Sequence, residues 1–126
     1  MAKLLALVIE DHESIRDIYM AALEMEGYTA EGITDGKDAL ETLGTVTPAL
    51  IILDMNLPHV SGHYLLKYIR GDERLKDVPV IISTANSILA NTVANDKTDK
   101  DFVLVKPIEI RQLQDVVRKV KARQST

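Results

Sequence analysis

Five short apolar segments recur along the chain, and they constrain its fold more than any other feature of the sequence. They lie at Leu4–Ile9, Tyr28–Ile33, Ala49–Leu53, Val78–Ser83 and Phe102–Val105, and all but the second are rich in β-branched residues. Continuous apolar runs of this length are typical of strands buried on both faces of a parallel sheet. The second run is more polar than the others, which indicates a strand nearer the edge of the sheet.

Segments with helical periodicity follow these predicted strands. After the first strand, apolar residues fall at i, i+3, i+4, i+7 and i+8 from Ile15. Ser14 or Glu13 is placed to begin this helix, and Gly27 is placed to end it. Four more helices are predicted at Asp38–Leu43, after Ser61, at residues 88–93 and at residues 110–120. Alternation of five strands with five helices predicts an α/β three-layer sandwich, with a five-stranded parallel sheet between two helical layers.

Length and composition indicate one globular domain. The 126 residues match the common size of a single domain, so we expect residues 1–126 to form one unit. A hydrophobic fraction of 46% with 27% charged residues is typical of a folded chain, not of a disordered one. The lack of cysteine excludes disulfides and thiolate metal sites. No apolar run approaches the ~20 residues that cross a bilayer, and Leu4–Ile9 is too short for a secretory signal, so we expect a cytoplasmic protein without membrane contact.

The charge distribution gives no direct sign of nucleic-acid binding. A net charge of −4 argues against contact between the domain as a whole and a phosphate backbone. Basic residues gather only near the C-terminus, at Arg118, Lys119, Lys121 and Arg123. Because cations in the last turn of a helix interact favourably with its dipole, we interpret them as a solvated helical turn. Contact with a nucleic acid is the alternative interpretation.

Polar residues capable of chemistry stand at the carboxyl ends of four predicted strands. They are Glu10-Asp11 after the first, Asp54 after the third, Thr84-Ala85 after the fourth and Lys106-Pro107 after the fifth. Ligands of open parallel sheets bind beyond these ends of the strands. We therefore expect three acids, a hydroxyl and an amine to converge at one rim of the sheet.

Such a cluster of acids needs a compensating cation. Two carboxylates about 5 Å apart repel by roughly 3 kcal/mol at an effective dielectric of about 20. Lys106 supplies one positive charge, and Mg²⁺, which prefers oxygen ligands, would supply the rest. The same residues suit phosphoryl transfer, with Asp54 as the central attacking acid. The metal, Lys106 and the Thr84 hydroxyl would then meet the oxygens of the transferred group.

This constellation resembles the receiver domain of bacterial response regulators, the chemotaxis-regulator-like switches of two-component signalling. The resemblance extends from Lys3 to about Lys121. It is carried, in the order and spacing of the family, by Glu10-Asp11, Asp54 with Pro58 and Gly62, Thr84-Ala85 and Lys106-Pro107. It implies a flavodoxin-like, doubly wound sheet with the strand order 2-1-3-4-5.

The resemblance also implies a phosphorelay reaction at Asp54. This residue would accept a phosphoryl group from a phosphohistidine on a sensor histidine kinase or a histidine phosphotransfer protein. Asp11, Asp54 and the backbone carbonyl of Asn56 would bind Mg²⁺, or Mn²⁺ in its place, and Glu10 would assist through a water molecule. The Asn56 side chain would influence how long the phosphate survives.

Further roles follow from the resemblance for residues around the phosphate. The acyl phosphate would be contacted by Thr84, Ala85 and Lys106. Asn86 would modulate the lifetime of the phosphate, and Pro107 would follow a cis peptide bond. A receiver catalyses only its own phosphorylation and dephosphorylation, so the chain is not expected to be an enzyme that turns over a metabolite.

Phosphorylation is expected to shift the conformations of a face made by the fourth helix, the fifth strand and the fifth helix, where a downstream partner or a second copy would bind. Val103 stands where the family often carries Tyr or Phe. Because side chains alternate along a strand, Phe102 should point to the other face and cannot replace the missing ring. Two other departures are Glu10 in place of the commoner Asp, and a charged segment at residues 96–100 in place of a small Ala- and Gly-rich stretch.

Two other functions are open on the sequence. A pseudo-receiver would keep the fold and bind partners without being phosphorylated; the missing aromatic favours it, and the complete set of site residues opposes it. A phosphatase of the haloacid dehalogenase type also sets Asp and Lys around Mg²⁺ at strand ends. That class uses an Asp-x-Asp motif on an early strand, whereas Asp54-Met55-Asn56 lies mid-chain and lacks the second acid.

Overall fold

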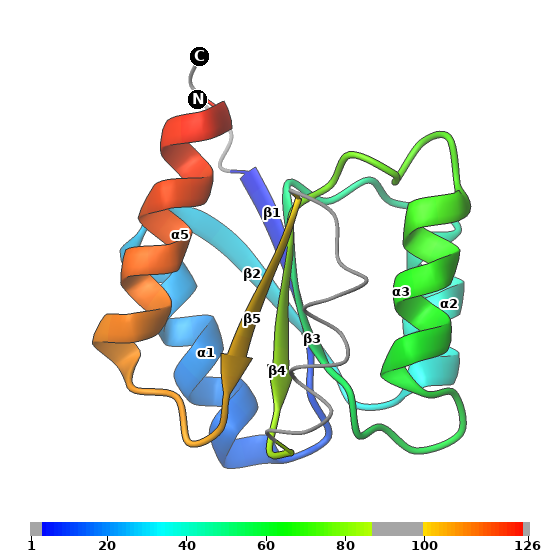
Figure 1. The fold of residues 1–126 in the computed structure, drawn as a ribbon, viewed down its shortest axis with the longest axis horizontal. Helices are drawn as coiled ribbons and strands as arrows, with labels where there is room; N and C mark the ends of the chain where they lie inside the picture. The colour runs from blue at the N-terminus through cyan, green and yellow to red at the C-terminus, as the bar shows by residue number, and fades with distance from the viewer. Residues whose placement is uncertain (1–3, 87–99, 125–126) are drawn as a thin grey trace.

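The computed structural model describes residues 4–86 and 100–124. Five parallel strands form one sheet in the order β2-β1-β3-β4-β5 (Figure 1). The strands are β1 (Leu4–Ile9), β2 (Tyr28–Ile33), β3 (Leu50–Asp54), β4 (Val80–Thr84) and β5 (Asp101–Val105). The predicted flavodoxin-like order is confirmed, and each predicted strand is present with boundaries within two residues of those expected.

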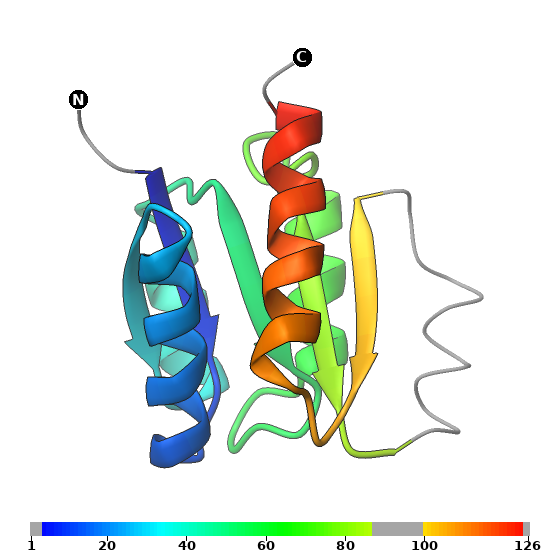
Figure 2. The ribbon, with the colours of Figure 1, turned by 90° about the vertical axis from the view of Figure 1, so that its left-hand side faces the viewer.

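Helices cover both faces of the sheet. The described part of the chain contains α1 (Glu13–Met25), α2 (Gly36–Leu43), α3 (Gly62–Gly71) and α5 (Ile110–Gln124). Helices α1 and α5 lie on one face, and α2 and α3 on the other (Figures 1 and 2). The structure therefore gives four of the five expected helices. The helix expected at residues 88–93 lies outside the described residues.

The N-terminal end of α1 matches one of the two predicted starts, although the cap residue itself was not predicted. The helix begins at Glu13, and its N-cap is His12, whose Nδ1 accepts a hydrogen bond from the backbone N–H of Ile15 over 3.4 Å. Ser14, the other predicted start, lies inside the first turn, where its side chain cannot occupy the cap position. Gly27 ends the helix as predicted, with a φ of 95°, a left-handed conformation that glycine adopts without strain.

Side-chain caps also set the first residues of α2 and α3. The Asp35 carboxylate accepts a hydrogen bond from the backbone N–H of Asp38 over 2.9 Å, so α2 begins two residues earlier than predicted. The predicted cap of α3 is confirmed, because the Ser61 hydroxyl accepts from the backbone N–H of Tyr64 over 3.2 Å. These caps fix where the loops at the carboxyl rim of the sheet end.

Two apolar layers hold the sandwich together, and β3 contributes to both. Ile51 and Leu53 pack toward α2 and α3, whereas Leu50 and Ile52 pack toward α1 and α5. Complete burial of an aliphatic side chain of this size stabilises the fold by about 1.5–3 kcal/mol. Likewise in β5, Val103 packs in the first layer and Phe102 in the second, which confirms that the two side chains point to opposite faces.

Three of the four basic residues near the C-terminus have partners within the fold. Arg118 forms an ion pair with Glu26 over 2.9 Å, and the Lys121 ammonium donates to the backbone carbonyl of Glu26 at the end of α1. Arg123 lies over the ring of Phe102, 5.2 Å from its centre. The prediction of a simply solvated turn is therefore incomplete, because these cations join α5 to α1 and β5. In the described part of the chain, every helix is too short or too polar to cross a bilayer.

Candidate functional site

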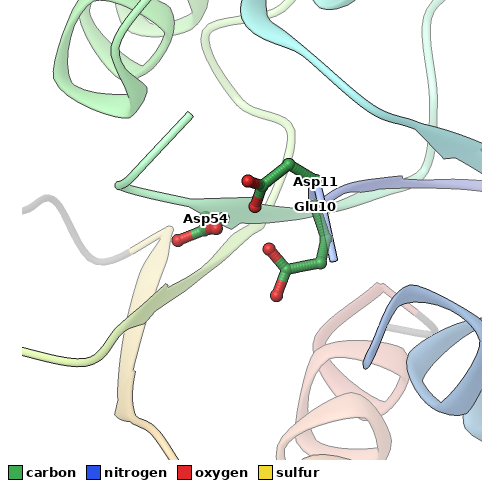
Figure 3. Close-up of side chains that lie close together, drawn as sticks. All are labelled: Glu10, Asp11 and Asp54. Atoms are coloured by element: carbon green, nitrogen blue, oxygen red, sulfur yellow. The ribbon is translucent and has the colours of Figure 1, made fainter. Parts of the chain in front are cut away.

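Three carboxylates converge at the carboxyl ends of two neighbouring inner strands, β1 and β3. Glu10 and Asp11 directly follow β1, and Asp54 is the last residue of β3. Each offers an oxygen within 4.8 Å of the others, and the three side chains point toward a common space (Figure 3). Within the described part of the chain, this is the one group of His, Asp or Glu side chains with the spacing to hold a metal ion.

The three acids differ in their exposure to water. Glu10 and Asp54 retain only 1% and 3% of their accessible surface, whereas Asp11 is exposed. Glu10 Oε1 accepts a hydrogen bond from Lys106, but the buried Oε2 has no hydrogen-bond partner among the residues that the structure describes. An unpaired buried carboxylate oxygen is costly, so this atom indicates a position that a ligand would occupy.

Lys106 carries the positive charge of the site from the end of β5. Its ammonium lies 2.7 Å from Glu10 Oε1 and 3.4 Å from Asp54 Oδ2. Its backbone N–H donates to the carbonyl of Thr84 over 2.7 Å, and its peptide bond to Pro107 is cis. Burial lowers the pKa of Lys106, but the hydrogen bond to Glu10 and the charge of Asp54 outweigh it, so the net shift is upward and the amine is charged.

Glu10 is the acid most affected by its surroundings. Burial raises the pKa of its carboxyl, the nearby Asp54 carboxyl raises it further, and Lys106 opposes both, with a result of about 8. One ammonium group therefore does not balance the three acids. The donor set and the unpaired Glu10 oxygen fit a hard divalent cation such as Mg²⁺, which binds one or two carboxylates and keeps several waters.

The loop after β3 is held close to Asp54. Asp54 Oδ1 accepts a hydrogen bond from the backbone N–H of Asn56 over 3.0 Å. Gly62, the first residue of α3, donates to the carbonyl of Met55 over 3.3 Å. A Cβ atom at Gly62 would lie 2.5 Å from both the Asp54 carbonyl oxygen and Met55 Cα. The glycine singled out in the sequence is therefore needed so that α3 can approach the backbone of the acidic residue.

The end of β4 supplies the remaining predicted residues. Thr84 is buried, and its hydroxyl oxygen accepts a hydrogen bond from the backbone N–H of Asn86 over 3.2 Å. Ala85 is exposed and, with Lys106 and Pro107, lines a hollow of about 330 Å³ beside the N-terminal half of α1. The other walls of this hollow are mostly apolar and come from Ile15, Ile18, Tyr19 and Ile108. The structure thus places all of the sequence-predicted residues at one rim, on adjacent strand ends.

Sequence reasoning missed two α1 side chains at this rim. Arg16 donates a hydrogen bond to the backbone carbonyl of Glu10 over 3.1 Å. The Tyr19 hydroxyl lies 3.5 Å from that of Ser83, and burial raises the pKa of Tyr19. The contact between Tyr19 and Ser83 had a signal in the sequence, because Ser83 is a polar residue in an otherwise apolar strand and Tyr19 lies on the apolar stripe of the helix.

The chain matches one protein family over most of its length. Residues 6–118 fit the family model described as the response regulator receiver domain. Among curated proteins, the DNA-binding dual master transcriptional regulator RpaA of Synechocystis sp. is 32% identical over 112 residues, which cover 89% of this chain and 46% of RpaA. The chain spans about half the length of RpaA and of several other curated relatives.

Solved receiver domains share the fold of this chain. The signal receiver domain of a putative LuxO repressor protein from Vibrio parahaemolyticus is 30% identical, with a TM-score of 0.84 over 98% of this chain and 93% of that one. The receiver domain of the sensor histidine kinase PA1611 from Pseudomonas aeruginosa, solved with a magnesium ion coordinated in its active-site cleft, is 25% identical, with a TM-score of 0.83 over 96% and 99%. With the acidic cluster and Lys106 at the sheet rim, these matches establish that the chain belongs to the response regulator receiver domain family of two-component signalling.

Proposed function

We propose that this receiver domain accepts a phosphoryl group on the carboxylate of Asp54. In the reaction, a carboxylate oxygen attacks the phosphorus of a phosphohistidine whose other ring nitrogen is protonated, the P–N bond breaks with its electron pair going to the ring nitrogen, and the histidine leaves as the neutral imidazole. The donor is a sensor histidine kinase or a histidine phosphotransfer protein. The observation that carries the proposal is the position of Asp54 between two other acids and an ammonium group 3.4 Å away, at the open end of a central strand.

A divalent cation belongs to the proposal. Asp11, Asp54 and the backbone carbonyl of Asn56 would hold Mg²⁺ or Mn²⁺, with Glu10 acting through a water molecule. The unpaired buried oxygen of Glu10 and the excess of negative charge support this assignment. So does the magnesium in the cleft of the PA1611 receiver domain. When bound, the cation neutralises phosphoryl oxygens and lets the three acids remain ionised together.

The other side chains at the rim are assigned to the phosphoryl group. Lys106, already charged and oriented by Glu10, would pair with one phosphoryl oxygen, and the Thr84 hydroxyl and the backbone at Ala85 would meet another. Asn56 and Asn86, each two residues beyond a site residue, would modulate the lifetime of the phosphate. The enzymatic activity would be limited to the phosphorylation and dephosphorylation of the domain itself.

The output of the domain is proposed to pass through protein contacts. Residues 1–126 would act as one receiver unit in the cytoplasm, and phosphorylation would shift the population of conformations of the face that includes β5 and α5. A downstream protein or a second copy would bind there. Val103 packs in the layer against α2 and α3. Because this residue has no aromatic ring, the shift would proceed without a ring at that position.

Intact-mass analysis after incubation with acetyl phosphate and Mg²⁺ tests the proposal. Wild-type protein should gain the mass of one phosphoryl group, and this gain should disappear in EDTA and in Asp54→Asn. Asp38→Asn, the same substitution at an exposed position on α2, is the matched control and should be phosphorylated like the wild type. A wild-type protein that gains no mass would favour the pseudo-receiver, and equal labelling of Asp54→Asn would assign the phosphoryl group to another residue.

A further inference from the structure

We propose that Arg16 is a positioning residue for the metal site, and that Gly32 is required because it leaves the space through which Arg16 reaches that site. The inference rests on the proposed binding of a divalent cation at Asp11 and Asp54. Neither residue belongs to the acidic cluster, and neither contacts the reacting atoms. They come from α1 and β2, which flank the end of β1.

Arg16 completes the support of the backbone just before the exposed metal ligand. The N–H of Glu10 donates to the carbonyl of Ile33 over 3.0 Å, which continues the pairing of β1 with β2. The carbonyl of Glu10 accepts from the guanidinium of Arg16 over 3.1 Å. This carbonyl belongs to the peptide group that leads into Asp11. The hydrogen bond therefore fixes the orientation of that peptide, and with it the direction in which the Asp11 side chain leaves the rim.

Gly32 makes this contact possible from the edge strand. A Cβ atom at position 32 would lie 2.8 Å from Arg16 Cδ and 2.9 Å from Met20 Sδ. Both are atoms of flexible side chains, so an added methyl group would be accommodated by moving them. Any side chain on Gly32 would thus displace the arginine from its path across β2 toward the Glu10 carbonyl.

Electrostatics and positioning predict opposite effects when Arg16 is removed. A positive charge near a cation site repels the cation, so on charge alone the loss of Arg16 would raise the affinity for Mg²⁺. A residue that orients a ligand-bearing backbone acts the other way, because removal of such outer support typically lowers metal affinity by about 10- to 100-fold. The sign of the change therefore separates the two roles.

The experiment measures Mg²⁺ binding to the unphosphorylated protein by isothermal titration calorimetry. Arg16→Met, which keeps much of the apolar stem, should weaken binding about tenfold. Arg16→Lys keeps the charge but loses the planar guanidinium, and it should recover only part of the affinity. Lys67→Met, the same loss of charge at an exposed position on α3, is the control and should bind like the wild type. In metal-free protein, the amide NMR resonances of Glu10 and Asp11 should shift in the Arg16 variants and not in the control.

A double-mutant cycle tests the part assigned to Gly32. Gly32→Ala alone should also weaken Mg²⁺ binding, but in the Arg16→Met background it should add no further loss, because both changes remove the same hydrogen bond. Unchanged or tighter binding in Arg16→Met, or full additivity with Gly32→Ala, would overturn the inference while leaving the proposed function intact. Wild-type protein that binds no Mg²⁺ would overturn both.

Discussion

The ammonium group of Lys106 donates a hydrogen bond to Oε1 of Glu10 over 2.7 Å, although the two residues are 96 positions apart in the sequence. The contact joins the end of β5 to the end of β1, across two intervening strands. Asp54, at the end of β3, lies 3.4 Å from the same ammonium group. One cation thus compensates two buried acids, and the charge balance of the rim depends on it whenever no metal is bound.

Replacing Lys106 with Met should destabilise the metal-free protein. The substitution leaves Glu10 and Asp54 buried without their compensating charge, and the loss of one partner of a buried polar contact costs about 1–3 kcal/mol. Urea denaturation in EDTA measures this change in the free energy of unfolding. Mg²⁺ should restore part of the loss. Lys37→Met, at an exposed position on α2, should match the wild type. A Lys106→Met protein as stable as the wild type in EDTA would mean that the ammonium is not needed to compensate the acids.

The position of the rim residues could be predicted from the sequence for a simple reason. The carboxyl ends of parallel strands share one edge, so once the apolar runs were assigned as strands, Glu10, Asp54 and Lys106 had to lie at the same rim, and the strand order implied by the family resemblance placed their strands close together. The Arg16 contact could not be predicted in this way. Helical periodicity tells which face of α1 a residue lies on, but not which carbonyl a long side chain reaches, nor that a bare position on β2 leaves room for it.

The N-terminal caps of the helices could likewise be predicted from the sequence only in part. Ser61 was predictable as a helix cap because its hydroxyl directly precedes the apolar stripe of α3. His12 was not, since Glu13 and Ser14 offered competing acceptors one and two residues further on. Sequence patterns give the approximate start of a helix, whereas the cap itself depends on which side chain the preceding strand places outside the first turn.

Removal of the buried ion pair at the amino end of β5 should lower the free energy of unfolding more than removal of an exposed ion pair. Arg70 on α3 forms an ion pair with Asp101, whose side chain is 1% exposed, at the start of β5. Asp101→Ala should lower the free energy of unfolding by about 3 kcal/mol, because it leaves the guanidinium partly buried without that partner. Glu73→Ala, which breaks the exposed pair with Lys76, should cost at most about 0.5 kcal/mol. Urea denaturation of both variants makes the comparison, and equal losses would show that burial does not set the strength of these pairs.

The two glycines that bound α3 should respond in opposite ways to alanine. At Gly62 a methyl group would overlap the backbone of Asp54 and Met55, so Gly62→Ala should lower the free energy of unfolding by about 1–3 kcal/mol. Gly71 has no atom within 4 Å of an added Cβ, so Gly71→Ala should raise the free energy of unfolding by about 0.5 kcal/mol. Because Gly62 packs on the acidic residue itself, Gly62→Ala should also weaken Mg²⁺ binding in calorimetry. If Gly62→Ala were destabilised but bound Mg²⁺ as tightly as the wild type, the packing of Gly62 on Asp54 would not contribute to metal binding.

The buried hydroxyl of Tyr28 should make the fold sensitive to alkaline pH. Tyr28 is 1% exposed, and its hydroxyl has no hydrogen-bond partner in residues 4–86 and 100–124. Burial, with a smaller effect from the charge of Glu26, raises the pKa of Tyr28. The unfolded chain therefore loses this proton first, at a pH of about 10. The stability that depends on the protonated phenol is complete below that pH and is lost as the pH rises toward the folded pKa.

Tyr28→Phe tests this sensitivity. At pH 7 the variant should be about 1 kcal/mol more stable than the wild type, because it removes a buried donor without a partner and keeps the ring under Lys121. Urea denaturation at a series of pH values from 7 to about 11 should show this advantage growing above the pKa of an unfolded tyrosine. Tyr64→Phe removes an exposed hydroxyl and should leave the free energy of unfolding unchanged across the series. A difference between wild type and Tyr28→Phe that stayed constant with pH would mean that the phenol ionises as readily in the folded protein as in the unfolded chain, and that burial does not raise its pKa.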